Sequence, residues 1–219
     1  MKKNLILVFL ALNSITGMAQ KNQVKIGGGI GGVPYEGTPG WNIEFQYEYN
    51  MTKRFSGFIA LGMNGDKFSS QGRSQGTDGT ETWDNSWRYQ YSERVNYFDA
   101  GFKYRIFKIG ERYKMKAAVG GSLAQSIFRY PENIFINRGR IEQQDDVTRK
   151  VEVGMLLVGL ENHISITERF GINLNLNYRT TFNEKHILTR EVKFHNGISS
   201  STSGILNLVN LTLQVGYLF

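Results

Sequence analysis

Three segments of the chain alternate apolar and polar residues with hardly a break. Residues 41–49 place Trp, Ile, Phe, Tyr and Tyr on one face and Asn, Glu, Gln and Glu on the other. Residues 170–179 repeat the pattern with an asparagine-rich polar face, and residues 209–219 repeat it once more. A period of two is typical of β-strands whose two faces meet different surroundings. These segments therefore predict strands that separate an apolar side from a polar side.

A weaker alternation of the same kind marks five further segments. Four of them lie near residues 24–30, 55–63, 98–106 and 115–123. The fifth, residues 151–166, contains the continuous apolar run 155–158, which fits either face. The turn that follows this segment favours one choice of outward-facing side chains, namely Leu156, Val158, Leu160, Ile164 and Ile166. The chain is thus predicted to contain about eight strands.

The connections between the predicted strands alternate in length. Short ones are expected near residues 52–54, 107–113 and 167–169, and long ones near residues 31–40, 65–94, 128–150 and 182–204. Residues 51–55 and 166–170 share the order apolar, Thr, charged, Arg, Phe, which predicts the same tight hairpin turn twice. Tight periplasmic turns and larger external loops are typical of bacterial barrels. We therefore predict an all-β fold, a closed antiparallel up-and-down transmembrane β-barrel with both termini on the periplasmic side.

The first residues have the order of a secretory signal peptide. Two lysines precede an apolar run over residues 5–12, and small residues then lead to Gln20. Positive charge, an apolar core and a small-residue cleavage site are the three parts of such a signal. The apolar run is shorter than the roughly 20 residues that a membrane-spanning helix needs. We expect residues 1–19 to be a signal peptide and residues 20–219 to form the outer-membrane β-barrel domain.

Composition narrows the classes of protein that fit. Cysteine is absent, so a disulfide framework, a thiolate metal site and a lipid-anchored N-terminal cysteine are all excluded. The net charge of +7 is scattered without a basic face, so no nucleic-acid partner is expected. The mean hydropathy of −0.35 is that of a soluble protein. Strands that alternate lipid-facing and lumen-facing residues average to the same value, so the membrane barrel is not excluded.

A soluble β-sandwich or a lipocalin-like barrel is the structural alternative, because both also use alternating strands. In those folds the apolar faces point into a core. Aromatic residues near the predicted strand ends favour the membrane barrel, because aromatic girdles mark the two membrane interfaces. These aromatic residues are Trp41, Tyr49, Phe55, Tyr104, Tyr178, Tyr217 and Phe219.

The last predicted strand ends in Leu-Gln-Val-Gly-Tyr-Leu-Phe over residues 213–219. With its eight alternating strands and its signal, the chain resembles the small OmpA/OmpX-like outer-membrane barrels. Its Thr-x-Arg-Phe turns and the Gln after the cleavage site are similar to those of Bacteroidota barrels. The resemblance implies export to the Gram-negative cell outer membrane, among lipid and lipopolysaccharide. It also implies that Tyr217 and Phe219 form the assembly signal that the barrel-assembly machinery recognises.

Charged residues recur on the predicted polar faces of the strands. An eight-stranded barrel has room for side chains but hardly for an aqueous channel. Buried charges are tolerated when they are paired. We therefore expect a mutually neutralising network inside the barrel in preference to a conduction path. Its expected members are Lys25, Glu44, Glu48, Asp99, Lys103, Arg105, Lys116 and Arg179.

One segment holds residue types that can carry out hydrolysis. Glu161, His163 and Ser165 are spaced two apart, so they share a strand face, and a His-x-Ser pair resembles that of outer-membrane lipid A deacylases. The predicted topology places this segment beside a periplasmic turn, whereas a lipid A hydrolase meets its substrate in the outer leaflet. A nucleophile, a base and an orienting group must also be in place. No catalytic residue is therefore assigned, and a non-enzymatic role is expected.

Metal and cofactor sites are not expected either. The three histidines, His163, His186 and His195, have no chelating spacing. Residues 27–32 are glycine-rich like a phosphate-binding loop, but no helix pattern follows them. Close packing within a strand explains these glycines better.

The longest predicted external connection, residues 65–94, carries the candidate interaction residues Trp83, Trp87, Tyr89 and Tyr91. Such aromatics can bind an extracellular glycan or protein ligand, or they can simply extend a β-ribbon above the membrane. The first hypothesis for function is therefore a non-enzymatic surface barrel with a structural or loop-mediated interaction role. A porin-like channel for small solutes or hydrophobic compounds is the alternative, and a lipid A-modifying enzyme is the third hypothesis.

Overall fold

Ten β-strands make up the regular structure in the part of the chain that the computed structural model describes. That part comprises residues 22–32, 40–78, 81–137, 140–181, 187–194, 199–205 and 207–219, so the predicted signal peptide lies outside it. The strands are β1 (Gln23–Gly32), β2 (Gly40–Asn50), β3 (Phe55–Asp78), β4 (Glu81–Ile109), β5 (Tyr113–Asn137), β6 (Arg140–Ser165), β7 (Phe170–Thr181), β8 (Ile187–Phe194), β9 (Ser199–Ile205) and β10 (Asn207–Leu218). Within the described ranges, no helix has the length and apolarity to cross a membrane.

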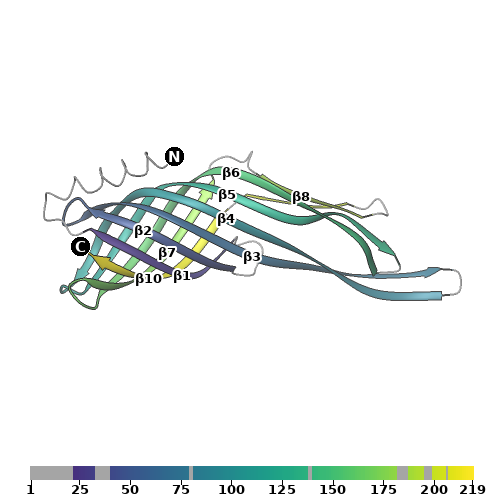
Figure 1. Cartoon of the computed structure of the whole chain (residues 1–219), viewed down its shortest axis with the longest axis horizontal. Coiled ribbons are helices and arrows are strands. Elements are labelled where there is room, and N and C mark those ends of the chain that lie inside the picture. The colour runs from purple at the N-terminus through teal and green to yellow at the C-terminus, as the bar shows by residue number, and fades with distance from the viewer. Residues whose placement is uncertain are drawn as a thin grey trace, which may run out of the picture.

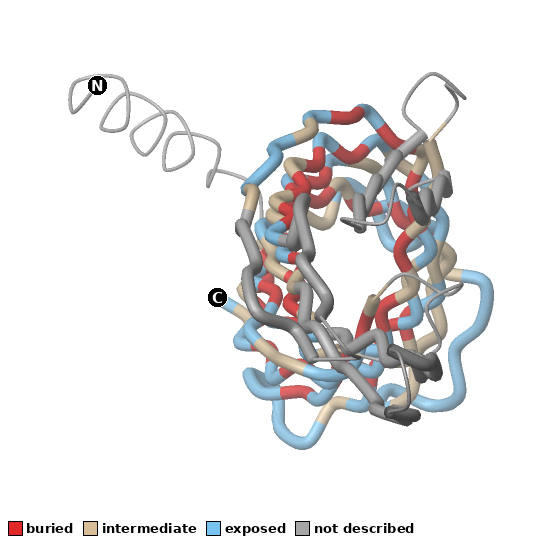
Figure 2. The backbone as a smooth tube through the Cα atoms, turned by 90° about the vertical axis from the view of Figure 1, so that its right-hand side faces the viewer, coloured by how far each residue is buried: buried red, intermediate tan, exposed pale blue. Residues whose placement is uncertain are grey.

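Eight of the strands pair in a closed ring. Neighbours in the order β1 to β7 and then β10 are antiparallel, and β10 pairs with β1 to complete the ring. Viewed along the barrel, the ring surrounds the interior on all sides (Figure 2). The hairpin of β8 and β9 adds to it through a short parallel contact with β5. The predicted fold class, an all-β closed antiparallel barrel of about eight strands, is confirmed.

The seam between the first and the last strand removes the free edges of the sheet. Its pairing runs without interruption from Gln23 opposite Leu218 to Gly32 opposite Val209. The backbones of Asn22 and Phe219 extend the seam with two hydrogen bonds of 3.0 and 3.1 Å. An unsatisfied backbone group costs several kcal/mol in hydrocarbon, so this closure is the condition for crossing a bilayer with strands.

Glycines in β1 let the seam close. Gly27 and Gly29 face the interior, where a Cβ atom would lie 2.0 Å from the carbonyl oxygens of Leu213 and Leu211. Any side chain there would push β10 away from β1. The interpretation of the glycine-rich segment as closely packed strand, and not as a phosphate-binding loop, agrees with this geometry.

The two faces of the ring have opposite chemistry. Outward-facing side chains are apolar and stay exposed, for example Leu123 with 69% and Ile26 with 60% of its surface free. Inward-facing side chains such as Asn173, Thr212 and Gln214 are polar and fully buried. A soluble sandwich or a lipocalin-like barrel would bury the apolar face instead, so that alternative is wrong for this fold.

The ambiguous segment within β6 has the predicted orientation. Val158, Leu160 and Ile164 are exposed on the outer surface, whereas Met155 and Leu157 are buried in the interior. The continuous apolar run therefore serves both faces of the same strand. This choice of outward residues is confirmed.

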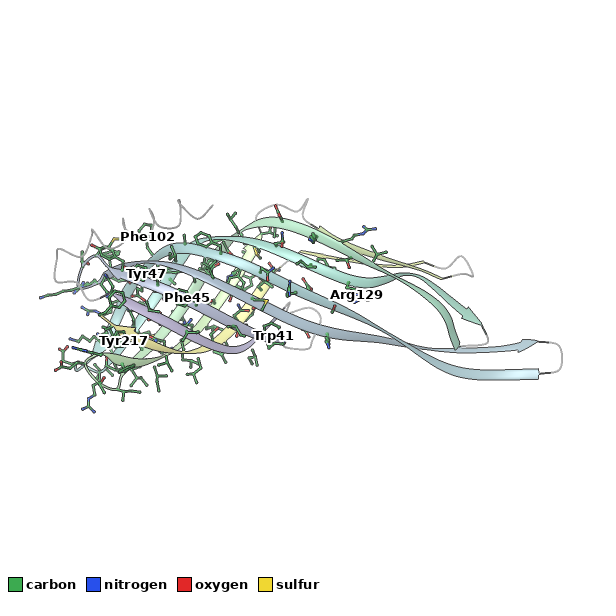
Figure 3. The ribbon with its side chains drawn as sticks, viewed as in Figure 1. Trp41, Phe45, Tyr47, Phe102, Arg129 and Tyr217 are labelled. Carbon is green, nitrogen blue, oxygen red and sulfur yellow. The ribbon has the colours of Figure 1, made fainter. Side chains whose placement is uncertain are left out.

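Aromatic rings gather at the end of the barrel that carries the short turns. There the ring centroids of Phe55 and Tyr104 are 4.9 Å apart, and those of Phe170 and Tyr217 are 5.1 Å apart. Figure 3 shows Tyr217 at this end and Trp41 at the opposite end of the outer apolar surface. Two aromatic zones that flank an apolar belt match the girdles of membrane barrels.

Two of the predicted long connections are mostly strand. The β3–β4 pairing continues from the barrel as far as Asp78 opposite Glu81, and the β5–β6 pairing as far as Asn137 opposite Arg140. Both hairpins project well beyond the ring (Figure 1). The prediction of loops over residues 65–94 and 128–150 is therefore corrected: paired strands satisfy the backbone hydrogen bonds that an extended loop would leave to water.

The repeated five-residue motif forms the same turn in both places. In the first, the hydroxyl of Thr52 accepts hydrogen bonds from the backbone N–H groups of Arg54 and Phe55, at 3.2 and 2.9 Å. In the second, Thr167 accepts the equivalent bonds at 3.2 and 3.0 Å. The threonine thus closes each turn by replacing a backbone acceptor. The prediction of two like hairpin turns is confirmed.

The outward face can be tested by placing a charge at two depths. Leu174 lies in the middle of β7 and faces outward with 42% of its surface exposed, whereas Ile166 lies at the turn end. In lipid vesicles, Leu174→Arg should lower the free energy of unfolding by about 2 to 4 kcal/mol, and Ile166→Arg by about 0 to 1 kcal/mol. Urea unfolding followed by tryptophan fluorescence measures both values. Equal costs for the two variants would show that the assigned membrane depth is wrong.

Candidate functional site

Five charged side chains near the turn end form what we call the lysine network: Lys25, Glu48, Lys103, Lys116 and Glu161. The Nζ atom of Lys25 donates to Glu48 at 2.6 Å and to both carboxylate oxygens of Glu161 at 2.7 Å. Lys103 is bonded to Glu161 and lies 3.6 Å from Glu48, and Lys116 is bonded to Glu48. Three ammonium groups therefore share two carboxylates, which leaves an excess of one positive charge.

A second group, the arginine cluster, lies further along the interior. Arg179 donates to Asp99 through Nε at 3.1 Å and through Nη2 at 2.5 Å, and its Nη2 also donates to Glu44 at 3.2 Å. Its guanidinium carbon lies 3.9 Å from the centre of the Tyr97 ring, and the Tyr97 hydroxyl donates to Glu44 at 3.1 Å. One cation faces two carboxylates here, so the cluster offsets the excess charge of the lysine network.

Together these groups fill the interior at their level. Lys25, Glu48 and Arg179 each have 0% of their surface accessible to water. Amide side chains bridge the space between them, since Gln214 donates to Glu44 at 2.9 Å and accepts from Asn175 at 2.7 Å. A water-filled passage along these residues would expose them. The predicted neutralising network is confirmed by these ion pairs for all its expected members except Arg105, which has no ion pair with the described carboxylates.

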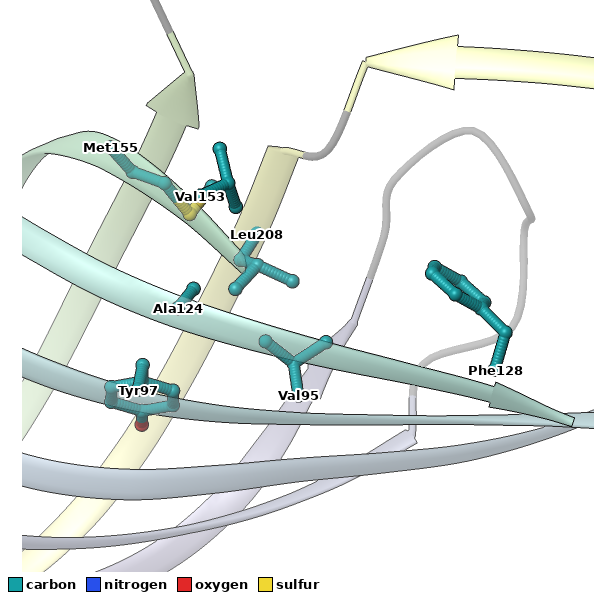
Figure 4. Close-up of a cluster of buried hydrophobic side chains, with 7 residues drawn as sticks. All are labelled: Val95, Tyr97, Ala124, Phe128, Val153, Met155 and Leu208. Atoms are coloured by element: carbon teal, nitrogen blue, oxygen red, sulfur yellow. The ribbon is translucent and has the colours of Figure 1, made fainter. Parts of the chain in front are cut away.

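An apolar cap, which the sequence interpretation missed, occupies the interior toward the long hairpins (Figure 4). It consists of the buried residues Val95, Tyr97, Ala124, Phe128, Val153, Met155 and Leu208. The run over residues 155–158 was a signal for it, because an apolar residue on each face of a strand needs an apolar neighbour inside as well as outside. The cap seals the ion pairs from the solvent at that end, which strengthens their mutual attraction.

His163 is held between two hydrogen-bonding partners. Its Nδ1 lies 2.7 Å from Oδ1 of Asn173, and its Nε2 lies 3.0 Å from Oγ of Ser165. Gly171 makes room for the ring, since a Cβ atom there would lie 2.4 Å from its Cε1 atom. Glu161, which the sequence placed on the same face, bonds lysines instead. Asn173 was missed because it lies opposite His163 on the neighbouring strand, a register that spacing along one strand does not give.

This arrangement has the order nucleophile, base and orienting group, but it faces the interior. His163 keeps 3% of its surface exposed, whereas an acyl chain in the bilayer would approach from outside the ring. Both ring nitrogens have partners, as buried polar groups require. The geometry therefore gives a lipid substrate no route to Ser165 from the membrane.

A half-open basin of about 690 Å³ lies at the turn end of the barrel. His163 borders it on the inner side, and Glu111 is the one carboxylate among the described residues of its lining. The basic residues of its lining are Lys53, Arg54, Arg105, Lys108, Lys114 and Lys116. Arg105 and Lys116, two expected members of the interior network, thus lie where the network meets this basin. We call it the turn-end basin.

The structure describes only the backbones of the four candidate interaction residues. Trp83, Trp87, Tyr89 and Tyr91 belong to the projecting part of β4, where their backbones pair with β3. The orientations of their side chains are outside the described part of the structure, so their role in binding stays a prediction. The pairing of β3 with β4 is also expected if these aromatic residues only extend a β-ribbon.

The histidine and carboxylate side chains can also be considered as ligands of a metal ion. Among the described side chains, no three His, Asp or Glu residues gather as they would around a metal ion. His186 and His195 lie outside the described residues. The expectation that the chain holds no transition metal and no cofactor therefore remains a prediction.

Comparison with known proteins supports the fold and leaves the activity open. No protein-family model matches the chain, and no curated protein is significantly similar to it in sequence. Among solved structures, Neisserial surface protein A matches with a TM-score of 0.54 and 9% identity, over 92% of this chain and 98% of the other. A major outer membrane protein from Thermus thermophilus matches with a TM-score of 0.50 and 13% identity, over 90% of this chain and 99% of the other.

At these identities the likeness shows a common fold alone. The predicted resemblance to small outer-membrane barrels is confirmed at the level of architecture. The resemblance to barrels of Bacteroidota is not tested and stays a prediction.

The lysine network can be tested by neutralising one of its two carboxylates. Glu161→Gln would remove one of the two ion pairs of Lys25 and the shorter of the two ion pairs of Lys103. Removing one partner of a buried pair costs about 3 to 5 kcal/mol, and the urea unfolding free energy of the refolded barrel should fall by that amount. Glu152→Gln is the control, because Glu152 is exposed on the same strand and should change stability by less than about 0.5 kcal/mol. A loss of similar size in both variants would mean that the network contributes nothing specific.

Proposed function

We propose that this chain is an integral protein of the Gram-negative outer membrane with a non-enzymatic role at the cell surface. The β3–β4 and β5–β6 hairpins carry that role, because they are the parts that extend beyond the ring (Figure 1). The observation that supports this most directly is the contrast between a filled interior and two long projecting hairpins. A structural contribution to the membrane is part of the same proposal.

The outer apolar belt supports the location. Side chains such as Leu61, Phe102 and Leu213 leave 58%, 58% and 56% of their surface without protein contacts. Water would make such a continuous belt unfavourable, whereas lipid tails cover it at no cost. Outer-membrane lipid and lipopolysaccharide are therefore the proposed surroundings of the ring.

The filled interior argues against the two other hypotheses. A porin-like channel needs a continuous bore, but the lysine network and the arginine cluster leave their central residues without water contact. A lipid A-modifying enzyme needs a reactive group on the lipid side of the outer leaflet, but Ser165 and His163 face inward at the turn end. In barrels of this type the short turns lie on the periplasmic side.

The hairpins offer a surface for a glycan or a protein. Their β3–β4 ribbon contains Trp83, Trp87, Tyr89 and Tyr91, which are residue types that stack on sugar rings and anchor protein interfaces. We propose an extracellular glycan or protein as the ligand of this ribbon.

The hairpin role can be tested by shortening the ribbon. Lys67 pairs with Ser92, so deleting residues 68–91 and joining these two residues with Asn-Gly should give a tight hairpin on an intact ring. A second test variant keeps the full length of the ribbon and replaces Trp83, Trp87, Tyr89 and Tyr91 by serine. Both variants should keep the shift of the gel band on boiling that marks a folded barrel, and both should lose binding to a glycan array and to immobilised serum proteins.

Two results would contradict this role. Binding that persists in both variants would remove the ribbon from the site. Single-channel currents through the unaltered protein in a planar bilayer would show that the interior conducts, and they would favour the channel hypothesis instead.

Assembly can be tested at the C-terminus. We propose that Tyr217 and Phe219 are recognised by the barrel-assembly machinery, and Phe219 is suited to this because 56% of its surface is exposed. Deleting Phe219 should lower the amount of protein in the outer membrane and raise its degradation in the periplasm. The lost packing is worth only about 1 to 2 kcal/mol, so a refolded barrel without Phe219 should unfold in urea almost normally. Normal membrane levels would refute the signal, and a large loss of stability would make Phe219 a structural residue.

A further inference from the structure

The β4–β5 hairpin places like charges directly opposite each other at the turn end. In its register Arg105 pairs with Lys116, and Lys108 pairs with Lys114. Directly opposed like charges destabilise an antiparallel pair. Two such pairs in succession lower the stability of the hairpin. We therefore look for a function that these cations could serve.

A β-bulge creates the second of these pairs. The register shifts between Arg105 and Phe107, so that Phe107 lies opposite Met115 and Lys108 lies opposite Lys114. In a regular strand of the same sequence, Lys108 would lie three residues after Arg105 and would therefore point to the opposite face, outward. Bulges commonly re-aim a side chain in this way. Here the bulge brings a further ammonium group to the turn-end basin.

The nearby carboxylates are already engaged by other cations. Glu111 accepts a hydrogen bond from Lys108 at 2.5 Å, and this bond holds the pKa of Glu111 below its usual value. Glu48 lies within the lysine network and bonds Lys116 there. Neither Arg105 nor Lys114 has an ion pair with a carboxylate of the described residues. The basin thus holds two half-buried cations that have no carboxylate of the described residues within ion-pair distance.

We propose that the turn-end basin is a binding site for a phosphate-bearing anion with two or more negative charges. Arg105 presents a planar guanidinium that can bind two phosphate oxygens at once, and Lys114 adds a point charge from the opposite strand. The basin volume of about 690 Å³ lies within the range of ligand pockets, about 300 to 1,000 Å³. The site does not depend on the proposed surface role, since it lies at the other end of the barrel.

The proposal predicts opposite effects of one substitution on stability and on binding. Lys114→Gln removes repulsion with Arg105, Lys108 and Lys116, so the empty barrel should resist urea as well as the parent or better. The same substitution should weaken anion binding about tenfold, the value of one charge-assisted hydrogen bond. A residue with a purely structural role would lose stability instead.

The experiment uses the full-length barrel refolded in a zwitterionic detergent at low salt. Pyrophosphate is titrated by isothermal calorimetry into the parent protein and into Lys114→Gln, Arg105→Gln and Arg169→Gln. Arg169 is the matched control, because it is an exposed cation at the same end of the barrel but outside the basin. We expect saturable binding to the parent and to Arg169→Gln, and binding about tenfold weaker in the other two variants.

A second arm separates the two sources of such an anion. Micelles are doped with short-chain phosphatidylglycerol, and phosphatidylcholine is the control lipid. If the ligand is a lipid headgroup, phosphatidylglycerol should raise the urea midpoint of the parent but not that of Lys114→Gln, and pyrophosphate should compete with it. If the ligand is a soluble phosphate compound, the doped lipid should have no effect while pyrophosphate still binds.

Both of these results support the basin as a phosphate site. Failure of the parent to bind either probe would overturn the proposal. Equal binding by the parent and all three variants would overturn it as well, because the contact would then be nonspecific. The heat-dependent gel shift of each variant shows that the barrel is folded before binding is compared.

Discussion

The rest of the structure depends on the demand that every strand find two partners. In hydrocarbon no water replaces a missing backbone hydrogen bond, so the sheet must close on itself. The seam of β1 and β10 meets that demand, and Gly27 and Gly29 are there because the closure leaves no space for side chains. With only eight strands, closure also fixes a narrow interior. The chemistry of the interior follows from that width.

A narrow interior lined by the polar faces of eight strands has to satisfy its charges internally. Lys25 reaches both Glu48 and Glu161, and Arg179 reaches both Asp99 and Glu44, so each cation is shared between residues that are far apart in sequence. Such sharing ties opposite sides of the ring together and excludes water. The same pairs that satisfy the interior charges also fill the interior at their level, and this filling is the reason we propose that function lies at the two ends.

Alternation along single strands was enough to predict the fold, the faces and most of the interior charges. The pattern over residues 41–49 identified Glu44 and Glu48 as interior residues, and the repeated turn motif placed two hairpins correctly. What alternation cannot give is the register between strands. The contact of His163 with Asn173 and the inward turn of Lys108 both come from register, one from a cross-strand pair and the other from a bulge. Loop composition likewise did not reveal that β3 and β4 stay paired far beyond the ring.

The hairpin end and the turn end of the barrel differ in how far they cover the interior charges, and this difference bears on function. At the hairpin end the apolar cap separates the interior charges from the projecting ribbons. At the turn end no such cap covers the lysine network among the described residues, and its excess positive charge lies next to Arg105 and Lys114. Because the field of a charge cluster is strongest where water is partly excluded, this half-open basin attracts anions more effectively than the same cations would on a flat surface. This asymmetry is the basis of both proposals, one for recognition by the projecting hairpins at one end and one for recognition by charge at the other.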